Sequence, residues 1–340
     1  MTHDAMNHGD LPSSSSDDDG HSVSPTEHAD EPRPADARHG VILLSYGTPD
    51  RLEDIPPYLT DIRGGRETSQ ELVDEITERY RRIGGRSPLA DITKSCARKL
   101  SAQLGLPVYV GMRHWTPYIK DVVTQIARET GIERLAAICM APHYSELSIG
   151  AYRTKLAEAI EQASRPIEMR FVPEWYTQTD FISGLALNLS VALKRIGTGS
   201  GPERAFVVFS AHSLPRFILE RGDPYPDQLL KTAKLVAEKL SLDQEQWTFC
   251  FQSAGQTAMP WLGPSVEEVV PKLAQEGHRR IVLAPIGFVA DHVEVLYDLD
   301  IEVPALLTEF EGLEIERTPM LNDSPSMIAA LAALATEALG

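Results

Sequence analysis

The residues best suited to chemistry are one histidine and a later run of carboxylates. Within that run Glu294, Asp298 and Glu302 recur every four residues. On a helix this spacing places the three carboxylates on one face, where like charges repel unless a cation or retained protons neutralise them. His212 follows an apolar stretch, and imidazole with carboxylate oxygen suits Fe²⁺, Zn²⁺ or Co²⁺. The pattern indicates a divalent metal site, and a solvated acidic face is the alternative.

Both features are predicted to lie where buried strands end. Short apolar runs bounded by Gly or Pro alternate with longer stretches of helical periodicity, which is typical of βα units in a mainly parallel sheet. Ligands bind such sheets beyond the carboxyl ends of the strands. Tyr46, His143, His212 and the segment after Pro285 all follow predicted strands, so we expect them to line one cleft. This position favours a functional acidic run over a merely solvated one.

The chain also repeats itself. Residues 41–49 resemble residues 207–215, because each stretch has an apolar strand, a serine, a polar residue and a closing proline. Tyr46 and His212 are the polar residues at equivalent positions. Two further pairs of segments match in the same order: 117–123 with 264–270, and 131–142 with 277–285. Three ordered correspondences predict two similar α/β halves.

Length and composition suit two domains of ordinary size behind a polar tail. The 340 residues are 42% hydrophobic and 24% charged, which is globular composition. We expect a disordered acidic tail over 1–38, an N-terminal domain over 39–178 and a C-terminal domain over 179–340, with the last helix packing back on the first domain. The N-terminus has no apolar secretion signal, and no run approaches the roughly 20 apolar residues of a membrane span. We therefore expect a cytoplasmic protein without membrane insertion.

Charge and cysteine content exclude several classes of function. The net charge is −17 and no Lys/Arg-rich stripe occurs, which argues against nucleic acid as a partner. The three cysteines form no CxxC pair, so neither a disulfide framework nor a cysteine-based zinc site is indicated. No GxGxxG or P-loop motif follows a predicted strand, so a nucleotide is not favoured. A small molecule or a metal ion fits this composition better.

Four motifs together resemble the ferrochelatase family. The resemblance runs from about Gly40 to the C-terminus, and the motifs are YGTP at 46–49, YRRIGGRSPL at 80–89, FSAHSLP at 209–215 and FVADHVEVLYDLD at 288–300. It implies insertion of Fe²⁺ into a porphyrin in haem biosynthesis. It also implies a chelatase-like fold, with two Rossmann-like, doubly wound parallel-sheet halves and an active-site cleft between them.

The resemblance assigns roles to the residues of the proposed metal site. His212 and Glu294 are implied to be catalytic and to bind the incoming metal, with Asp298 and Glu302 as secondary metal positions. Metal insertion needs such groups, because two pyrrole protons leave while the iron sheds water. Ferrous iron is then a substrate, and no prosthetic group is expected. The C-terminal segment lacks the cysteines that hold a [2Fe–2S] cluster in some relatives.

One subgroup of the family fits better than the other. Tyr46 and the short charged segment 51–86 look like the coproporphyrin type, whereas protoporphyrin-type enzymes commonly have Met at that position and a longer apolar lip. In the coproporphyrin type the tyrosine approaches the porphyrin metal from the face opposite the histidine. Arg79 and Tyr80 also fit an ordinary helix surface. The positions that match porphyrin binding in the family are Tyr46, Arg63, Arg79, Tyr80, Ser87 and Tyr152.

Other functions stay open at this point. They are a protoporphyrin IX ferrochelatase, a cobalt or nickel chelatase for a sirohydrochlorin-type ring, and a non-catalytic tetrapyrrole or metal carrier. For the favoured function the expected partners are coproporphyrin III, ferrous iron and, transiently, the next enzyme of the haem pathway. We expect a monomer.

Overall fold

The structure is a computed structural model that describes residues 37–197, 204–255 and 259–340. All of these residues fall in one compact unit. The predicted disordered tail over 1–38 lies outside the described residues except for its last two positions.

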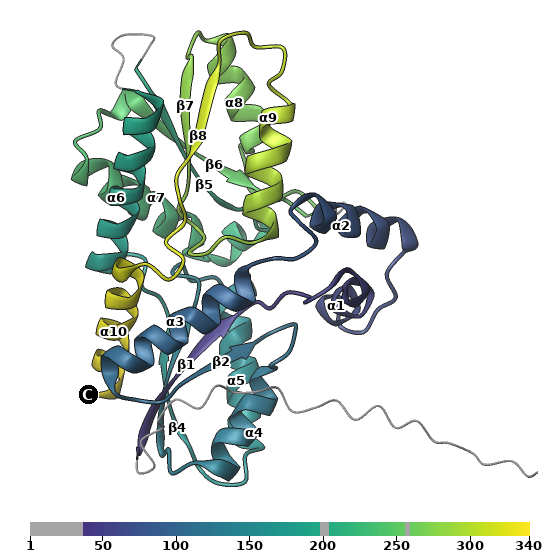
Figure 1. The fold of residues 1–340 in the computed structure, drawn as a ribbon, viewed down its shortest axis with the longest axis vertical. Helices are drawn as coiled ribbons and strands as arrows, with labels where there is room; N and C mark the ends of the chain where they lie inside the picture. The colour runs from purple at the N-terminus through teal and green to yellow at the C-terminus, as the bar shows by residue number, and fades with distance from the viewer. Residues whose placement is uncertain (1–36, 198–203, 256–258) are drawn as a thin grey trace, which may run out of the picture. The chain divides into compact units, whose positions relative to one another are not determined.

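The described strands form two four-stranded sheets, and every strand pair is parallel. The strand orders are β2-β1-β3-β4 and β6-β5-β7-β8 (Figure 1). The first sheet contains β1 (His39–Ser45), β2 (Val108–Met112), β3 (Arg134–Cys139) and β4 (Glu168–Val172). The second contains β5 (Phe206–His212), β6 (Trp247–Gln252), β7 (Arg280–Pro285) and β8 (Glu314–Arg317). The two matching orders confirm the prediction of two similar α/β halves.

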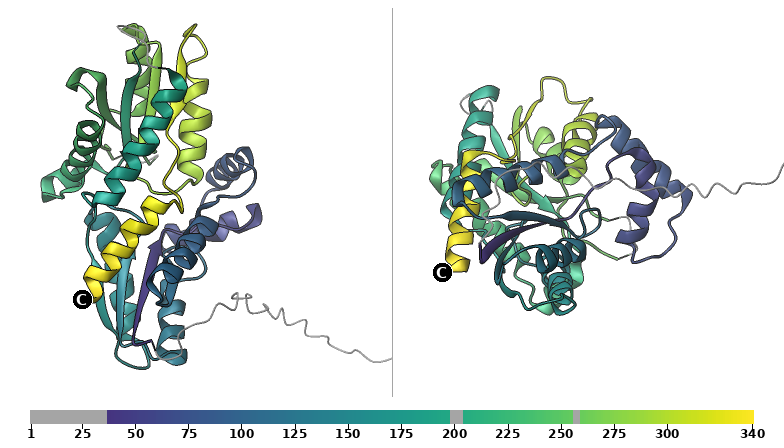
Figure 2. Two further views of the ribbon diagram at one scale, coloured as in Figure 1. Left: turned by 60° about the vertical axis from the view of Figure 1, so that its left-hand side comes forward. Right: turned by 60° about the horizontal axis from the view of Figure 1, so that its bottom comes forward.

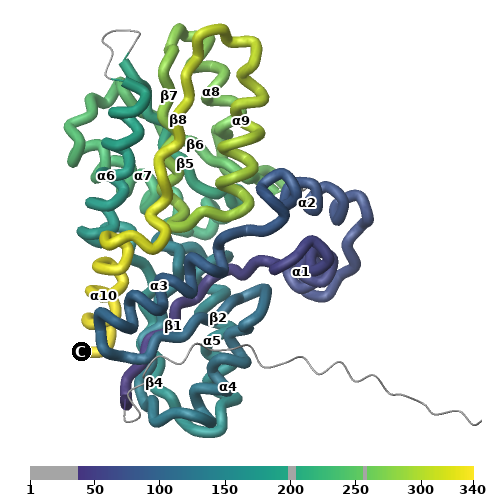
Figure 3. The backbone as a smooth tube through the Cα atoms, in the orientation of Figure 1, coloured from purple at the N-terminus to yellow at the C-terminus, as the bar shows by residue number. Residues whose placement is uncertain are grey.

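Helices connect the strands, as the alternating sequence pattern predicts. The elements up to β4 are η1 (Leu52–Asp54), α1 (Ile55–Ile62), α2 (Gln70–Arg82), α3 (Leu89–Leu104), α4 (Ile119–Glu129), η2 (Glu146–Gly150) and α5 (Ala151–Glu161). Those that follow are α6 (Thr179–Ile196), η4 (Arg216–Arg221), α7 (Tyr225–Lys239), η5 (Gln244–Gln246), α8 (Val266–Gln275), η6 (Glu294–Glu302), α9 (Val303–Ala305) and α10 (Pro325–Leu339). The backbone trace in Figure 3 shows α1 and α2 projecting to one side, and α2 contacts η6.

The central strands are buried on both faces, which explains their continuous apolar runs. In β1, Val41 and Leu43 pack on the side of α3 and α6, whereas Ile42 and Leu44 pack on the side of α4 and α5. This alternation follows from the two-residue period of a strand. In the second sheet Val208 faces α8 and η6. The buried strands therefore hold their carboxyl ends in fixed positions, and the polar residues Tyr46 and His212 lie at these ends.

One hydrophobic cluster joins the two halves. It contains buried residues of β1 and β3, of β5 and β7, and of α6 and α10. The last helix, α10, begins with Ser324 as its N-cap and Pro325 in its first turn. It contacts α3, α6, β3 and β4, so the C-terminal segment lies against the first sheet (Figure 2). The exact domain boundary near residue 178 stays a prediction.

None of the helices in the described part of the chain is both long enough and apolar enough to cross a membrane.

Leu331 offers a test of the shared cluster. Its side chain in α10 is fully buried. We expect Leu331→Ala to lower the free energy of unfolding by about 2–5 kcal/mol, because it removes apolar contacts and leaves a cavity. Urea unfolding measures this change. The control is Leu187→Ala on α6, where the leucine is 59% exposed and the expected change is small. Equal losses in the two variants would contradict a joining role for this cluster.

Candidate active site

His212 is the last residue of β5, and the backbone carbonyl of the next residue orients its ring. Its Nδ1 contacts the carbonyl oxygen of Ser213. Since a carbonyl can only accept, Nδ1 donates, and in the neutral imidazole the lone pair is then on Nε2. This Nε2 lies 3.6 Å from Oε2 of Glu294. The hydroxyl of Tyr225 donates to the carbonyl oxygen of His212 at 3.0 Å, which holds the strand end in place.

Glu294 begins η6 and faces a second histidine as well. Nε2 of His292 also lies 3.6 Å from Oε2 of Glu294, and its Nδ1 bonds to the carbonyl oxygen of Ala290 at 2.9 Å. Sequence reasoning gave His292 no role. The signal that could have found it is its place two residues before Glu294 in the same motif.

The charges around Glu294 keep it ionised. Burial by itself would raise the pKa of the Glu294 carboxyl, but the positive charge that His212 has when it is protonated opposes burial. The hydrogen bond and charge of His292, with the charge of Arg79, add to that effect, and the pKa of Glu294 falls below its usual range. Burial lowers the pKa of His292, yet the hydrogen bond and charge of Glu294 outweigh it and raise that pKa. The site therefore presents an anionic oxygen between two imidazoles.

The four-residue spacing of the acidic run predicts a helix but leaves open whether Glu294 lies on a regular α-helix or at a π-bulge. Residues Glu294–Glu302 form a π-helix, whose hydrogen bonds join residues five apart and not four. Residues four apart share a face in a π-helix as they do in an α-helix, yet the carboxylates of the run differ in exposure. Glu294 has a side chain that is 37% exposed, whereas the side chain of Asp298 is 4% exposed. Only part of the run is therefore open to solvent.

Asp298 is buried and has a basic partner. Its Oδ1 lies 3.3 Å from Nη1 of Arg79, and the hydroxyl of Ser253 donates to its Oδ2. Burial raises the pKa of Asp298 to about 7; Ser253 and Arg79 oppose this shift, and Glu294 and Glu302 add to it. The repulsion expected from the sequence is thus answered by a cation and by proton retention together.

Tyr46 follows β1 and lies within electrostatic range of the same carboxylate. Its ring packs on His114 with centroids 4.7 Å apart. Burial, and next the negative charge of Glu294, raise the pKa of Tyr46 to about 12. The residue is 40% exposed, so its ring offers a surface to a ligand. Its place on the opposite face of a bound porphyrin stays a prediction.

The remaining porphyrin-binding candidates differ in accessibility. Arg63 is partly exposed, and its Nε is buried without a hydrogen-bond partner among the described residues. Arg79 is held by Glu75 at 3.0 Å in addition to Asp298.

Tyr80 is buried, not on a helix surface, and its hydroxyl bonds to that of Thr48 at 2.9 Å. Two other candidates, Ser87 and Tyr152, are also buried. For these three, contact with a porphyrin stays a prediction.

His143 does not line an open site, which corrects the sequence expectation. It is 3% exposed, and burial lowers its pKa to about 3. Its Nε2 bonds to the hydroxyl of Thr232 at 2.9 Å, and that hydroxyl donates to the carbonyl oxygen of Tyr176. His143 therefore donates to Thr232. The chain turns back into the core after β3, so a strand exit alone did not ensure exposure.

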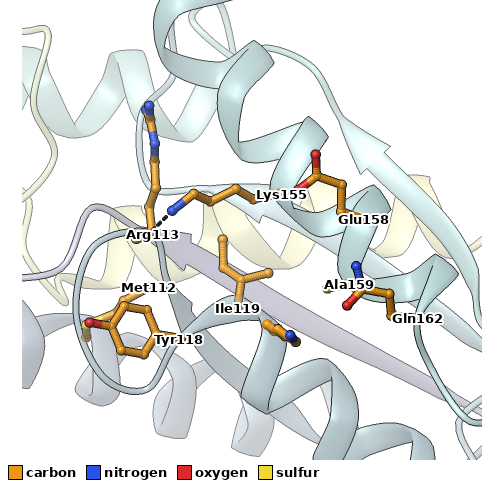
Figure 4. Close-up of a pocket in the computed structure, with 9 residues that line it drawn as sticks. Met112, Arg113, Tyr118, Ile119, Lys155, Glu158, Ala159 and Gln162 are labelled. Atoms are coloured by element: carbon orange, nitrogen blue, oxygen red, sulfur yellow. Dashed lines mark hydrogen bonds between the residues drawn. The ribbon is translucent and has the colours of Figure 1, made fainter. Parts of the chain in front are cut away.

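A pocket of about 280 Å³ lies elsewhere, beside α4 and α5 (Figure 4). In it Lys155 donates to the carbonyl oxygen of Arg113 at 2.8 Å. The pocket contains none of the predicted site residues. Its lining consists of Met112, Arg113, Tyr118, Ile119, Lys120, Lys155, Glu158, Ala159 and Gln162.

Across the described ranges, no three or more His, Cys, Asp or Glu side chains form a ready-made metal site. His212 and Glu294 instead provide two donors that face each other. Two donors with open positions suit a metal ion that must be passed on and not kept.

The family model and the similar proteins all indicate the same family. A family model described as Ferrochelatase matches residues 38–339. A ferrochelatase of Deinococcus radiodurans is 41% identical over 300 residues, which cover 87% of this chain and 94% of that protein. A coproporphyrin III ferrochelatase of Geobacillus sp. is 39% identical over 306 residues, which cover 88% of this chain and 97% of that protein.

Two solved structures share the fold at low sequence identity. SirB from Bacillus subtilis, solved with Fe³⁺, has a TM-score of 0.56 at 12% identity, over 89% of this chain and 96% of that chain. A multi-domain protein of Deinococcus radiodurans, described as structurally similar to chelatases, has a TM-score of 0.52 at 12% identity, over 88% of this chain and 55% of that chain. Both support the chelatase-like arrangement of two halves.

The raised pKa of Asp298 predicts a specific dependence of stability on pH. The folded carboxyl titrates near 7, whereas an unfolded aspartate titrates near 3.8. The folded state thus keeps a proton that the unfolded state loses, and the free energy of unfolding falls as pH rises from 4 to 8. Asp298→Asn should remove this fall, on the order of 3 kcal/mol.

Urea unfolding at pH 4 and pH 8 measures the difference between the variant and the unaltered protein. Asp74→Asn, at an exposed position of α2, is the control. Parallel pH profiles for Asp298→Asn and the unaltered protein would show that the pKa of Asp298 is the same in the folded and unfolded states.

Proposed function

Because the chain belongs to the ferrochelatase family, a family of metal-inserting lyases, we propose that its porphyrin substrate is coproporphyrin III. We also propose that His212 and Glu294 receive the ferrous iron. Iron and porphyrin are then both substrates, and no prosthetic group takes part.

The observation that carries the metal assignment is the orientation of His212. Its Nδ1 donates to a carbonyl, so the Nε2 lone pair and the anionic Oε2 of Glu294 converge at 3.6 Å. Two electron-pair donors turned toward each other favour a cation between them. Metal-binding histidines usually have their second ring nitrogen hydrogen-bonded in this way, because that bond fixes the tautomer and the ring orientation.

The same residues can manage the protons of the reaction. Iron insertion releases two pyrrole protons while the iron loses its water ligands, so a base must lie beside the ring. Neutral imidazole at His212 accepts one of these protons at Nε2 once the iron has left that nitrogen, and the second proton passes to solvent water. The carboxylate of Glu294 is too weak a base at neutral pH to hold a proton for long, because its pKa lies below the usual range. Glu294 therefore acts through its charge, which attracts the metal and stabilises a protonated histidine.

The choice of coproporphyrin III rests on Tyr46 and on arginines. Coproporphyrin III has four propionates, and arginine binds carboxylates with two parallel hydrogen bonds. Arg63 has a buried Nε for which the described residues provide no acceptor. Several relatives near 39% identity, among them those of Geobacillus and Anoxybacillus flavithermus, are named coproporphyrin III ferrochelatases.

His212→Ala tests the metal assignment. We expect iron insertion at saturating Fe²⁺ to slow by about a hundredfold or more, because both a metal ligand and a proton acceptor are lost. Anaerobic absorbance measurements of porphyrin consumption report the rate. His278→Ala, at a histidine that packs on Phe206, is the matched control and should retain full activity. An unimpaired His212→Ala enzyme would refute the assignment.

Substrate preference tests the coproporphyrin assignment. Protoporphyrin IX lacks two of the four propionates, so each lost carboxylate forfeits a charge-assisted hydrogen bond. We expect kcat/KM for coproporphyrin III to exceed that for protoporphyrin IX by about tenfold or more. Zn²⁺ insertion followed by fluorescence gives both values without interference from oxygen. A higher kcat/KM for protoporphyrin IX would reverse the assignment while leaving the family unchanged.

A further inference from the structure

We propose that Arg317 is a positioning residue that anchors the chain both before the π-helix and within it, and thereby keeps Glu294 directed at His212. This inference rests on the proposed role of His212 and Glu294 in receiving the metal. Arg317 lies outside the four motifs and is far from His212 in the sequence.

Arg317 is the last residue of β8, which runs beside the helical segment formed by η6 and α9 (Figure 1). Its Nε and Nη2 bond to the two carboxylate oxygens of Asp300 at 2.6 and 2.9 Å. Its Nη2 also lies 3.3 Å from Oδ1 of Asp291. Asp300 lies within η6, and Asp291 lies three residues before the first residue of η6. One guanidinium therefore contacts carboxylates on both sides of Glu294.

The guanidinium itself is fixed in place. Its side chain is 16% exposed, and Nη1 donates to the carbonyl oxygen of Thr318 at 3.0 Å. Planar guanidinium with two parallel hydrogen bonds to one carboxylate gives a defined orientation that lysine cannot reproduce. Asp300 is exposed, so its pair with Arg317 is partly screened by solvent, whereas the pair with Asp291 is more enclosed.

Asn322 adds a second attachment at Asp291. Its Nδ2 donates to Oδ2 of Asp291 at 2.7 Å, and its Oδ1 accepts from the backbone N–H of Asp291 at 2.8 Å. Ser95 and Lys99 of α3 bond to the adjacent Asp323. The segment after β8 thus ties the start of the π-helical region to a helix of the first half.

The π-helix needs such support. π-Helices are rare and mostly a single turn long, whereas this one has nine residues. The region also concentrates negative charge, which favours a different backbone or a displaced side chain. Its carboxylates are Asp291, Glu294, Asp298, Asp300 and Glu302.

The ion pairs divide these carboxylates by role. Arg317 neutralises Asp291 and Asp300, and Arg79 neutralises Asp298. Glu294 instead faces imidazoles, which release it to a metal more readily than a guanidinium does. Arg317 therefore fixes the backbone on both sides of Glu294.

The test compares Arg317→Met, Arg317→Lys and Asp300→Asn with the unaltered protein. The matched control is Arg195→Met. Arg195 is exposed, and its Nη1 lies 3.1 Å from Oε1 of Glu316, the residue before Arg317 on β8. Co²⁺ binding to the porphyrin-free protein, followed by its visible absorption, measures the metal site without turnover. Steady-state Zn²⁺ insertion gives kcat and the KM for metal and for porphyrin, and thermal melting monitors folding.

We expect Arg317→Met to weaken Co²⁺ binding and to raise the metal KM by about tenfold, with the porphyrin KM unchanged. Asp300→Asn should act in the same direction at smaller magnitude, Arg317→Lys should restore part of the affinity, and Arg195→Met should match the unaltered protein. Unchanged Co²⁺ affinity in folded Arg317→Met and Asp300→Asn would overturn the inference. A loss of kcat with both KM values unchanged would also overturn it.

His212→Ala separates this inference from the proposed function. If His212→Ala leaves Co²⁺ binding unchanged, the metal site itself is misassigned. If His212→Ala abolishes binding while Arg317→Met and Asp300→Asn do not weaken it, the site is correct and only the positioning role of Arg317 fails.

Discussion

Repulsion between carboxylates on one short helical segment is the constraint on which the site depends. Asp291, Glu294, Asp298 and Asp300 each face a charged or ionisable group from a distant part of the chain. Arg79 comes from α2, Arg317 from β8 and His212 from β5. These partners are distant from η6 in the sequence, and only the fold brings them next to it. The site therefore exists only when both halves are assembled, and no local stretch of the chain could form it alone.

The core provides the rigidity that this charge arrangement needs. A cluster running through α6 and α10 packs on the strands of both sheets, so the ends of β1 and β5 are held in one framework. Those two ends present Tyr46 and His212. An error of even 1 Å between two groups that face each other would alter their electrostatic interaction strongly in a poorly solvated site. Burial of apolar residues far from the metal site thus sets the geometry at the metal site.

The sequence predicted the parts of this structure that depend on local pattern. Continuous apolar runs such as 41–44 identified buried parallel strands, and the internal repeat placed Tyr46 and His212 at equivalent strand ends. It could not predict the π-helix, because residues four apart share a face in both kinds of helix. It also missed Arg317, since its partners are known only once β8 is placed beside η6. His143 shows the opposite error, because a residue after a strand can still turn inward.

A chelatase must bind a metal ion and then lose it to the porphyrin, and the described residues meet these two demands separately. Arg79 pairs with Asp298, an acid that would otherwise help to complete a tight oxygen-rich site. Among the described residues, the ion-pair partners of Glu294 are two imidazoles at 3.6 Å, a distance that is too long for a strong hydrogen bond and leaves room for an ion. A third or fourth strong ligand at this position would lower the free energy of the bound metal and raise the barrier to its transfer. The pair of Arg79 with Asp298 thus limits the strength of metal binding, which makes transfer to the ring feasible.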